Sequence, residues 1–229
     1  MVTMKRDYII AIDGPAASGK STTAKELARW FGYTYIDSGA MYRAVALKII
    51  DENIDHNDRQ RLEEMLSKIK ISFETTEAPD ETYLQRIFLD GKDVSCRIRE
   101  QNVTKLSSEI AVIGRVRERL VDMQREMGNA GGVIMDGRDI GTVVFPDADF
   151  KFYLTASVKT RAFRRWKELA DPKTNPEEIE KDLLWRDHND SNRAHSPLRK
   201  AEDAIIVDTT DLTIEEQVNY ILNYIKSRQ

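Results

Sequence analysis

The chain has 229 residues, of which 41% are hydrophobic and 32% charged, and its formal net charge is −4. These values suit a globular protein with one large domain or a core with insertions, and the acidic balance argues against a nucleic-acid-binding protein. No apolar stretch is long enough to cross a membrane, and the apolar run at residues 8–12 is too short for a signal peptide. The single cysteine, Cys96, excludes an internal disulfide and fits a reducing cytoplasm, and with only three histidines a zinc site is disfavoured.

Strands and helices alternate along most of the chain. We expect helix 20–32 to bury Leu27, Trp30 and Phe31 on one face and to stop at Gly32. Asn175-Pro176 is expected to open a helix. The expected strands are 7–12, 33–36, 131–136, 149–156 and 204–210. The expected helices are 20–32, 38–53, 58–69, two within 102–128 that meet near Gly114, 158–170, 175–193 and 213–228.

A strand-rich island interrupts this alternation. Residues 70–75 and 83–95 have strand patterns, and Asp90-Gly91 is a hairpin-turn signal. We interpret residues 64–104 as an insertion. The rest predicts an α/β protein with a parallel sheet covered by helices on both faces, a three-layer core.

The segment Gly14–Ser21 reads GPAASGKS and matches the phosphate-loop pattern G-x-x-x-x-G-K-[ST], with a strand before it and a helix after it. Its glycines let backbone N–H groups turn toward phosphate, and Lys20 supplies a positive charge. The Ser21 hydroxyl can bind Mg²⁺. A plain glycine turn is the alternative. The pattern alone does not identify the nucleotide, although no guanine-reading N-K-x-D sequence is present.

Three further segments bring arginine to the predicted sheet edge. Asp37–Arg43 follows the second strand, and Asp136-Gly137-Arg138-Asp139 follows a later one, with Asp136 placed to organise Mg²⁺. Arg186, Asp190 and Arg193 share one helix face at i, i+4 and i+7. Each segment alone could be a helix cap, a turn or a surface ion-pair ladder. Together they indicate an anion site beside the phosphate loop.

The chain resembles bacterial cytidylate kinases over nearly its whole length. The resemblance lies in the segments IDGPAASGKSTTAK, YIDSGAMYRAVAL, LDGKDVSCRIR, MDGRDIGTVVFPDA, RDHNDSNRAHSPL and VDTTDLTIEEQV. It implies a P-loop core at 1–63, 105–158 and 196–229, a β-rich monophosphate-binding insert at 64–104, and a helical arginine-rich lid at 159–195. One departure is Ser21-Thr22 after Lys20, where many members have Gly-Thr.

The resemblance also implies ATP as donor, CMP and dCMP as acceptors, and Mg²⁺ as the ion. Arg43, Arg138 and Arg193 resemble the arginines on the acceptor phosphate, Arg186 and Asp190 the ribose-binding pair, and Ser108, Arg117 and Asp139 the cytosine-reading set, with Ser38 in the same site. The expected donor site comprises Gly14, Pro15, Ala16, Ala17, Ser18, Gly19, Lys20, Ser21 and Thr22, with Arg161 and Arg165, or Arg164, closing from the lid. The expected metal ligands are Ser21 and Asp136, and the expected catalytic residues are Lys20, Arg43, Arg138 and Arg193.

Physical chemistry supports the cytosine-reading set. A carboxylate at Asp139 can accept from the N4 amine of cytosine, while Arg117 and Ser108 can donate to N3 and O2. Uracil reverses the polarity at two of these positions, so such a site would reject it strongly. Two alternatives are a kinase for UMP or AMP and a non-catalytic nucleotide-binding switch. We expect a monomer with small-molecule substrates and neither nucleic acid nor membrane as a partner.

Overall fold

The computed structural model describes residues 7–77, 83–169, 175–193 and 195–228. The chain forms two compact units, Met1–Tyr33 with Gly131–Gln229, and Thr34–Ala130. Three of the expected features lie partly outside the described residues. They are the insert (78–82), the lid (170–174 and 194) and the N-terminal segment that was considered and rejected as a signal peptide (1–6). Among the residues that are described, no helix has the length and apolar character needed to span a membrane.

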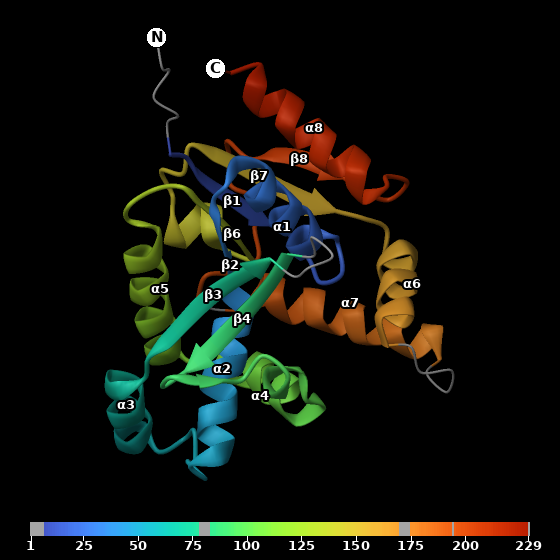
Figure 1. Ribbon diagram of the computed structural model, residues 1–229. Helices are drawn as coiled ribbons and strands as arrows, with labels where there is room; N and C mark the ends of the chain where they lie inside the picture. The colour runs from blue at the N-terminus through green and yellow to red at the C-terminus, as the bar shows by residue number, and fades with distance from the viewer. Residues whose placement is uncertain (1–6, 78–82, 170–174, 194, 229) are drawn as a thin grey trace. The chain divides into compact units, whose positions relative to one another are not determined.

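The first unit contains four parallel strands in the order β6-β1-β7-β8 (Figure 1). Their bounds are β1 (Ile9–Asp13), β6 (Val133–Gly137), β7 (Phe150–Thr155) and β8 (Ile205–Asp208). Every residue of β6 and all but the first of β1 are buried, as expected of apolar strands covered on both faces. The register sets Asp13 opposite Gly137, so the segments that follow β1 and β6 begin at the same sheet edge.

Helices flank this sheet. They are α1 (Lys20–Phe31), α6 (Val158–Leu169), α7 (Pro176–Asn192) and α8 (Ile214–Lys226). Helix α1 packs against β6, β1 and α8 and ends, as predicted, at Gly32, whose left-handed φ of 69° suits glycine. Leu27 and Phe31 are buried, but the expectation for Trp30 was wrong. Its side chain is 50% exposed, with the ammonium group of Lys226 4.9 Å from its ring centroid.

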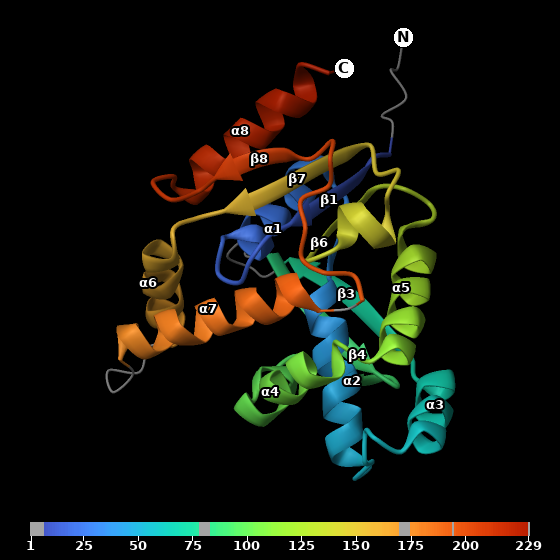
Figure 2. The same ribbon diagram turned by 180° about the vertical axis from the view of Figure 1, so that it is seen from behind.

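Helices α6 and α7 pack against each other (Figure 2). Asn175 caps α7 by accepting from the Glu177 N–H, with Pro176 at the first turn, as predicted. A small core of Ala162, Ile179 and Leu183 joins the two helices. Ala16 and Ala17 of the phosphate loop pack against that same core, so the loop and these helices share apolar contacts.

The second unit is mostly helical and carries a three-stranded antiparallel sheet, β3-β4-β5. Its elements are β2 (Thr34–Asp37), α2 (Ser38–Asp51), α3 (Arg59–Lys68), β3 (Ile71–Glu77), β4 (Tyr83–Leu89), β5 (Lys92–Asp93), the 3₁₀ turn η1 (Arg97–Arg99), α4 (Gln101–Ile110) and α5 (Gly114–Gly128). Helix α2 packs against α4, α5 and β4. The break near Gly114 and the Asp90-Gly91 hairpin turn are confirmed, and both turn residues have positive φ.

The α/β class is therefore confirmed, with a parallel sheet flanked by helices. The β-rich strands lie within the expected 64–104 range. The five expected segments of core, insert and lid remain a prediction, because the two compact units divide the chain at other positions. Two short elements were not anticipated: the 3₁₀ turn η1, and the π-helical turn η2 (Ile140–Val144), which follows β6.

Candidate active site

The phosphate loop runs from the end of β1 to the start of α1. Gly14 has a φ of 147°, and a Cβ there would lie 2.0 Å from the backbone oxygen of Leu154. Gly19, with a φ of 91°, is the N-cap of α1 and makes no side-chain cap bond. The first N–H groups of α1 thus point out of an end that no N-cap side chain covers, which suits an anion.

Carbonyl oxygens of this loop are held by side chains. The ammonium group of Lys20 donates to the Pro15 carbonyl at 2.7 Å, and Arg161 donates to the Ala16 carbonyl at 3.1 Å. The hydroxyl of Thr209, just after β8, donates to the Ser18 carbonyl at 3.0 Å. Fixing the carbonyls in this way suits a loop whose N–H groups face a phosphate.

Lys20 is buried, and its surroundings destabilise the protonated form of its amine. Burial is the main cause that lowers the pKa of Lys20 to about 7, followed by repulsion from Arg138, while Asp136, Asp13 and Asp190 act in the opposite direction. A phosphate at this position would favour the protonated amine. The amine is therefore poised to gain charge when an anion binds.

A hydroxyl and a carboxylate meet beside the loop. The exposed Ser21 hydroxyl donates to the buried Asp136 carboxylate at 2.9 Å. Both are the hard oxygen ligands that Mg²⁺ prefers, and Mg²⁺ is commonly held by one or two such groups together with substrate phosphates. The residues present at this position therefore fit the ion.

Two arginines and two aspartates form a cluster next to this pair. The Arg138 guanidinium donates to Asp190 at 2.8 Å. Arg193, with only 5% of its side chain exposed, lies 3.7 Å from a carboxylate oxygen of Asp139 and 3.7 Å from one of Asp190. Burial alone would lower the pKa of Arg138, but the Asp190 charge and hydrogen bond raise it. Asp190 thus offsets the cost of burying the Arg138 guanidinium and orients it.

The predicted helical spacing of these residues was wrong in one respect. Helix α7 ends at Asn192, and Arg193 is its C-cap in an extended conformation, with a hydrogen bond of 2.6 Å to the Ser196 carbonyl. Arg193 therefore reaches Asp190 from beyond the helix and not along one face of it.

Arg186 is repelled by two neighbouring arginines and attracted by two aspartates. Burial is the main cause that lowers the pKa of Arg186, and repulsion from Arg165 and Arg138 lowers it further. Asp182 and Asp190 act in the opposite direction. Like charges that repel one another at this range favour an anion between them. Arg165 also pairs with Glu168 at 3.0 Å on its own helix.

The other two arginines of the segment expected to form a lid have structural partners. Arg161 is buried, forms an ion pair of 2.6 Å with Asp187 of α7, and donates to the phosphate loop. Arg164 donates to the hydroxyl and carbonyl of Thr209. Both side chains thus hold α6 in place, Arg161 against the phosphate loop and Arg164 against the segment after β8.

In the second unit, α2 presents Ser38 and Arg43. Asp37 caps α2 by accepting from the Ala40 N–H at 2.9 Å, and its other oxygen accepts from Arg43 at 3.0 Å. The capping interpretation of Asp37 is thus confirmed. The convergence of Arg43 with Arg138 and Arg193 stays a prediction, since Arg43 belongs to a different unit from the other two.

Ser108 and Arg117 lie on α4 and α5. Arg117 is buried, stacks 5.6 Å from the ring centroid of Tyr42, and donates to the Ala111 carbonyl at 3.3 Å. Ser108 is exposed and donates to the Thr104 carbonyl of its own helix at 3.4 Å. Their placement against Asp139 also stays a prediction.

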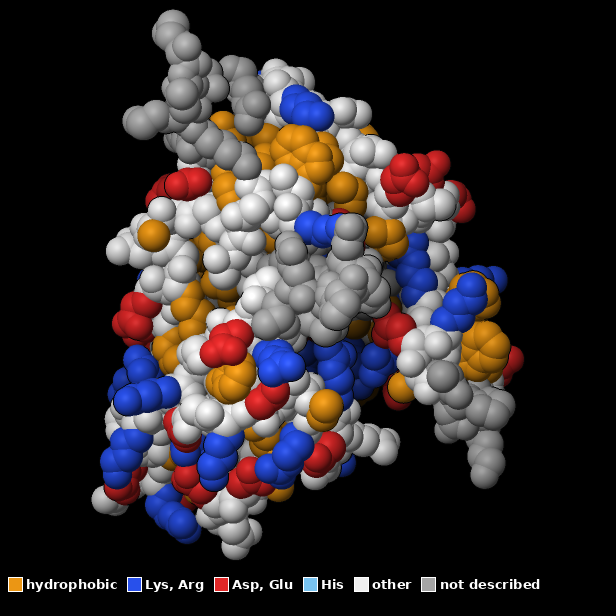
Figure 3. All heavy atoms as spheres, in the orientation of Figure 1, with side chains coloured by type: hydrophobic (Ala, Val, Ile, Leu, Met, Phe, Trp, Pro, Cys, Tyr) orange, Lys and Arg blue, Asp and Glu red, His pale blue; other side chains and the backbone are white. Residues whose placement is uncertain are grey.

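Other charged side chains of the second unit form ordinary surface pairs. Arg115 pairs with Glu63 at 3.1 Å and with Glu118 at 3.0 Å. Figure 3 shows Lys and Arg interspersed with Asp and Glu over the part of the surface that includes α3. Arg115 is therefore an ordinary surface arginine with paired charges.

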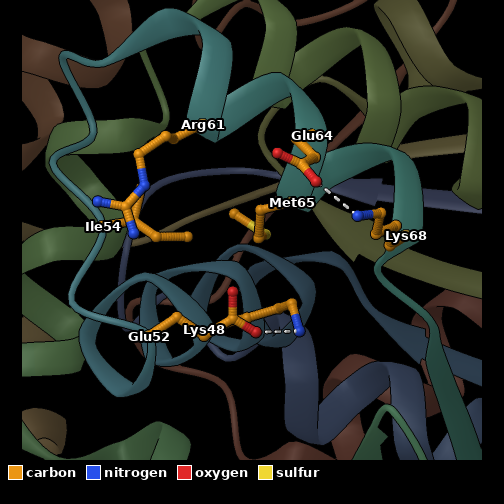
Figure 4. Close-up of a pocket in the computed structure, with 7 residues that line it drawn as sticks. All are labelled: Lys48, Glu52, Ile54, Arg61, Glu64, Met65 and Lys68. Carbon is orange, nitrogen blue, oxygen red and sulfur yellow. Dashed lines mark hydrogen bonds and ion pairs between the residues drawn. The ribbon is translucent and has the colours of Figure 1, made fainter.

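A cavity of about 210 Å³ lies between the C-terminal part of α2 and α3. It is lined by Lys48, Glu52, Ile54, Arg61, Glu64, Met65 and Lys68 (Figure 4). Lys48 pairs with Glu52 at 2.7 Å, and Lys68 with Glu64 at 2.6 Å. Lysine and glutamate side chains that line the cavity therefore form ion pairs with each other. The cavity lies near the C-terminal end of α2, away from Ser38 at the first turn of that helix.

Sequence reasoning missed four residues that hold the phosphate loop, helix α1 or the turn η2 in place. Asp187 holds Arg161, Thr209 holds Ser18, and Gln217 accepts from Thr23 at 2.9 Å. The fourth, Asp13, accepts two backbone N–H groups of η2. Asp13 and Thr209 stand inside conspicuous motifs, but nothing local to the sequence identifies their partners.

The comparisons with known proteins agree on one family. The family model "Cytidylate kinase" matches residues 10–227. A cytidylate kinase of Pediococcus pentosaceus is 48% identical over 226 residues, covering 98% of each chain. One of Desulfitobacterium hafniense is 49% identical over 222 residues, covering 96% of this chain and 93% of its own.

A solved structure matches the fold alone. An uncharacterized protein from Eubacterium ventriosum superimposes with a TM-score of 0.52 at 12% identity, covering 97% of this chain and 99% of its own.

Proposed function

The chain belongs to the cytidylate kinase family and is an ATP-dependent kinase that phosphorylates CMP, and we propose that the residues described above divide this reaction into a donor half and an acceptor half. The observation that carries the proposal is the joining of Lys20, Ser21–Asp136 and the Arg138–Asp190–Arg193 cluster in one compact unit. We extend the acceptors to dCMP as part of the same proposal.

In the donor half, the phosphate loop binds the triphosphate of ATP. The N–H groups at the start of α1 and the charge of Lys20 attract its β- and γ-phosphates. The Lys20 amine, now bonded to the Pro15 carbonyl, would turn toward the phosphates. Arg161 fixes the loop from outside, and Arg165 neutralises the transferring group.

Ser21 and Asp136 would hold Mg²⁺. Their oxygen atoms already lie 2.9 Å apart, and the ion would take the place of the hydrogen bond between them, with the Ser21 hydroxyl keeping its proton. When bound, Mg²⁺ neutralises charge that develops on the phosphates.

In the acceptor half, Arg138 and Arg193 bind the phosphate of CMP and bring its oxygen into line, with Arg43 joining from α2. Asp190 holds both arginines in place and, with Arg186, meets the ribose hydroxyls. No side chain need form a covalent intermediate, because positioning and charge neutralisation account for most of the catalysis of phosphoryl transfer.

Base selection is assigned to Asp139, Arg117 and Ser108. Asp139 is buried and 3.7 Å from Arg193, so it is preorganised as an acceptor for the N4 amine of cytosine. Ser38 lies in the same acceptor site. We also propose that the protein is a cytoplasmic monomer. Light scattering on a size-exclusion column tests whether it is a monomer.

The proposed function is tested by an acceptor panel of CMP, dCMP, UMP and AMP with Mg-ATP. We expect turnover with CMP and dCMP, and values of kcat/KM for UMP and AMP lower by orders of magnitude. Equal use of UMP would contradict the base assignment. ATP binding without turnover of any acceptor would indicate a nucleotide-binding switch.

Lys20→Ala tests the donor half. We expect loss of turnover by about 100-fold or more, since a charge on the transferred phosphate loses its counterion. The matched control is Lys25→Ala, on the same helix, which should keep turnover near the wild-type value. Circular dichroism checks that both variants fold. Near-normal activity of Lys20→Ala would remove Lys20 from the mechanism.

A further inference from the structure

Asp13 caps a helical turn that lies far from it in the sequence. Its two carboxylate oxygens accept from the N–H groups of Ile140, at 2.8 Å, and Gly141, at 2.7 Å. These are the first N–H groups of η2, and they have no partner within the turn itself. Strand β1, which ends at Asp13, and strand β6, which leads into η2, are hydrogen-bonded neighbours.

Asp139 is the N-cap residue of η2 and would ordinarily perform this task itself. Aspartate at an N-cap prefers to accept from N–H groups of its own helix, as Asp37 does for α2 and Asp58 for α3. Asp139 makes no such bond. Its carboxylate lies instead 3.7 Å from the guanidinium of Arg193.

We propose that Asp13 is a positioning residue: by capping η2 from β1, it takes over the capping role of Asp139, whose carboxylate is thereby held away from its own turn and faces the base of the acceptor nucleotide. This inference rests on the proposed role of Asp139 in reading cytosine. Without Asp13, the orphan N–H groups of η2 would draw the Asp139 carboxylate back onto its own turn, where it could not accept from the cytosine amine.

The chemistry of the contact explains why a carboxylate is required. Asp13 is buried and pairs through its backbone with Gly137 on one side and Tyr153 on the other, so its side chain has little freedom. Both oxygens must accept, because both partners are N–H donors. An asparagine would keep the shape but would aim its own NH₂ group at one of these donors.

The test is a double-mutant cycle with Asp13→Asn and Asp139→Asn, read as the ratio of kcat/KM for CMP to that for UMP. We expect Asp13→Asn to lower this ratio by about tenfold or more, and the double variant to be no less selective than Asp139→Asn alone. If Asp13 had a purely structural role, Asp13→Asn would lower the free energy of unfolding, but its effect on the CMP to UMP ratio would not depend on the residue at 139. The inference is overturned if Asp13→Asn keeps the wild-type ratio, or if the two losses multiply.

The matched control is Asp149→Asn. The Asp149 carboxylate also accepts a backbone N–H of β1, that of Ile9 at 2.9 Å, but at the other end of the strand. It should leave the CMP to UMP ratio unchanged. The wild-type panel separates the two claims: equal use of CMP and UMP by the wild type overturns the proposed function, whereas a wild-type preference that Asp13→Asn retains overturns only the inference.

A measurement on the wild type covers the case in which Asp13→Asn does not fold. Hydrogen exchange, read residue by residue, should show the amides of Ile140 and Gly141 protected to the level of the adjoining strand β6. Exchange as fast as that of an exposed loop would overturn the capping role.

Discussion

Two ionisable side chains beside the phosphate loop have pKa values displaced toward neutrality. Lys20 is lowered to about 7 and Asp13 is raised to about 6, and burial is the largest cause of both shifts. Hydrogen bonds from Gly141 and Ile140 lower the pKa of Asp13 and limit its rise. In the ligand-free protein, these two groups therefore titrate near neutral pH, a range in which surface lysines and aspartates do not titrate.

The Lys20 shift predicts that ATP binding depends on pH. The charged amine binds phosphate, so affinity should fall as the pH rises from 7.5 to 9, by at most about tenfold per unit, with uptake of a proton on binding. Isothermal titration in buffers of different ionisation enthalpy measures that proton. Lys20→Met, which cannot titrate, should bind more weakly with a flat profile over this range. A flat wild-type profile would contradict the lowered pKa.

At the scale of elements, the segments after β1 and α1 are built by backbone conformation as much as by side chains. Gly14 and Gly32 bracket the loop and helix α1, and both have positive φ. They differ in surroundings: the Cβ of a residue at 14 would collide with the Leu154 carbonyl, whereas at 32 nothing lies within 4 Å.

This difference predicts unequal costs for two identical substitutions. Gly32→Ala should lower the free energy of unfolding by about 1 kcal/mol, the cost of placing a side chain in the left-handed region. Gly14→Ala should cost about 1–3 kcal/mol more, because the strand backbone cannot yield as a side chain can, and it should also weaken ATP binding. Urea unfolding and a nucleotide-binding assay measure both. Equal costs would contradict the close approach of the loop to β7.

At the scale of the whole molecule, the two displaced groups act on stability in opposite directions. Asp13 has a raised pKa, so its contribution to stability is full below about pH 4 and is lost as the pH rises through 6. Lys20 has a lowered pKa, so the folded state gains stability as the pH rises from 7 toward 10.5. Paired surface carboxylates such as Asp51 and Asp90 have lowered pKa values, so their contribution to the stability of the protein is lost only in acid.

The ligand-free protein should therefore have a shallow minimum of stability between about pH 6 and 7. From pH 6.5 to either pH 5 or pH 8.5, we expect the free energy of unfolding to rise by about 1–2 kcal/mol. Tryptophan fluorescence is a suitable probe, because Trp30, Trp166 and Trp185 all lie in the unit that holds Asp13 and Lys20. A stability that falls steadily from pH 6.5 to 8.5 would contradict the Lys20 assignment.

The sequence by itself determined the elements and the family. Alternating apolar runs, Gly32 as a helix stop, the Asp90-Gly91 turn and the phosphate-loop pattern are local signals, since each depends on residues within a few positions. The α/β class followed from these signals, the cytidylate kinase family was implied by the resemblance of six segments to known members, and both were confirmed. The exposed position of Trp30 did not follow, because burial depends on which helices pack around it.

Only the tertiary structure decided the side-chain partners. Arg138 finds Asp190 52 residues away, Arg161 finds Ala16 across 145, and Asp13 finds Ile140 across 127. These pairings depend on the order β6-β1-β7-β8, which brings distant strand ends to one edge and which no local pattern specifies. For that reason the sequence identified Asp139 as a candidate base reader, while the structure identified Asp13 as the residue that caps its turn.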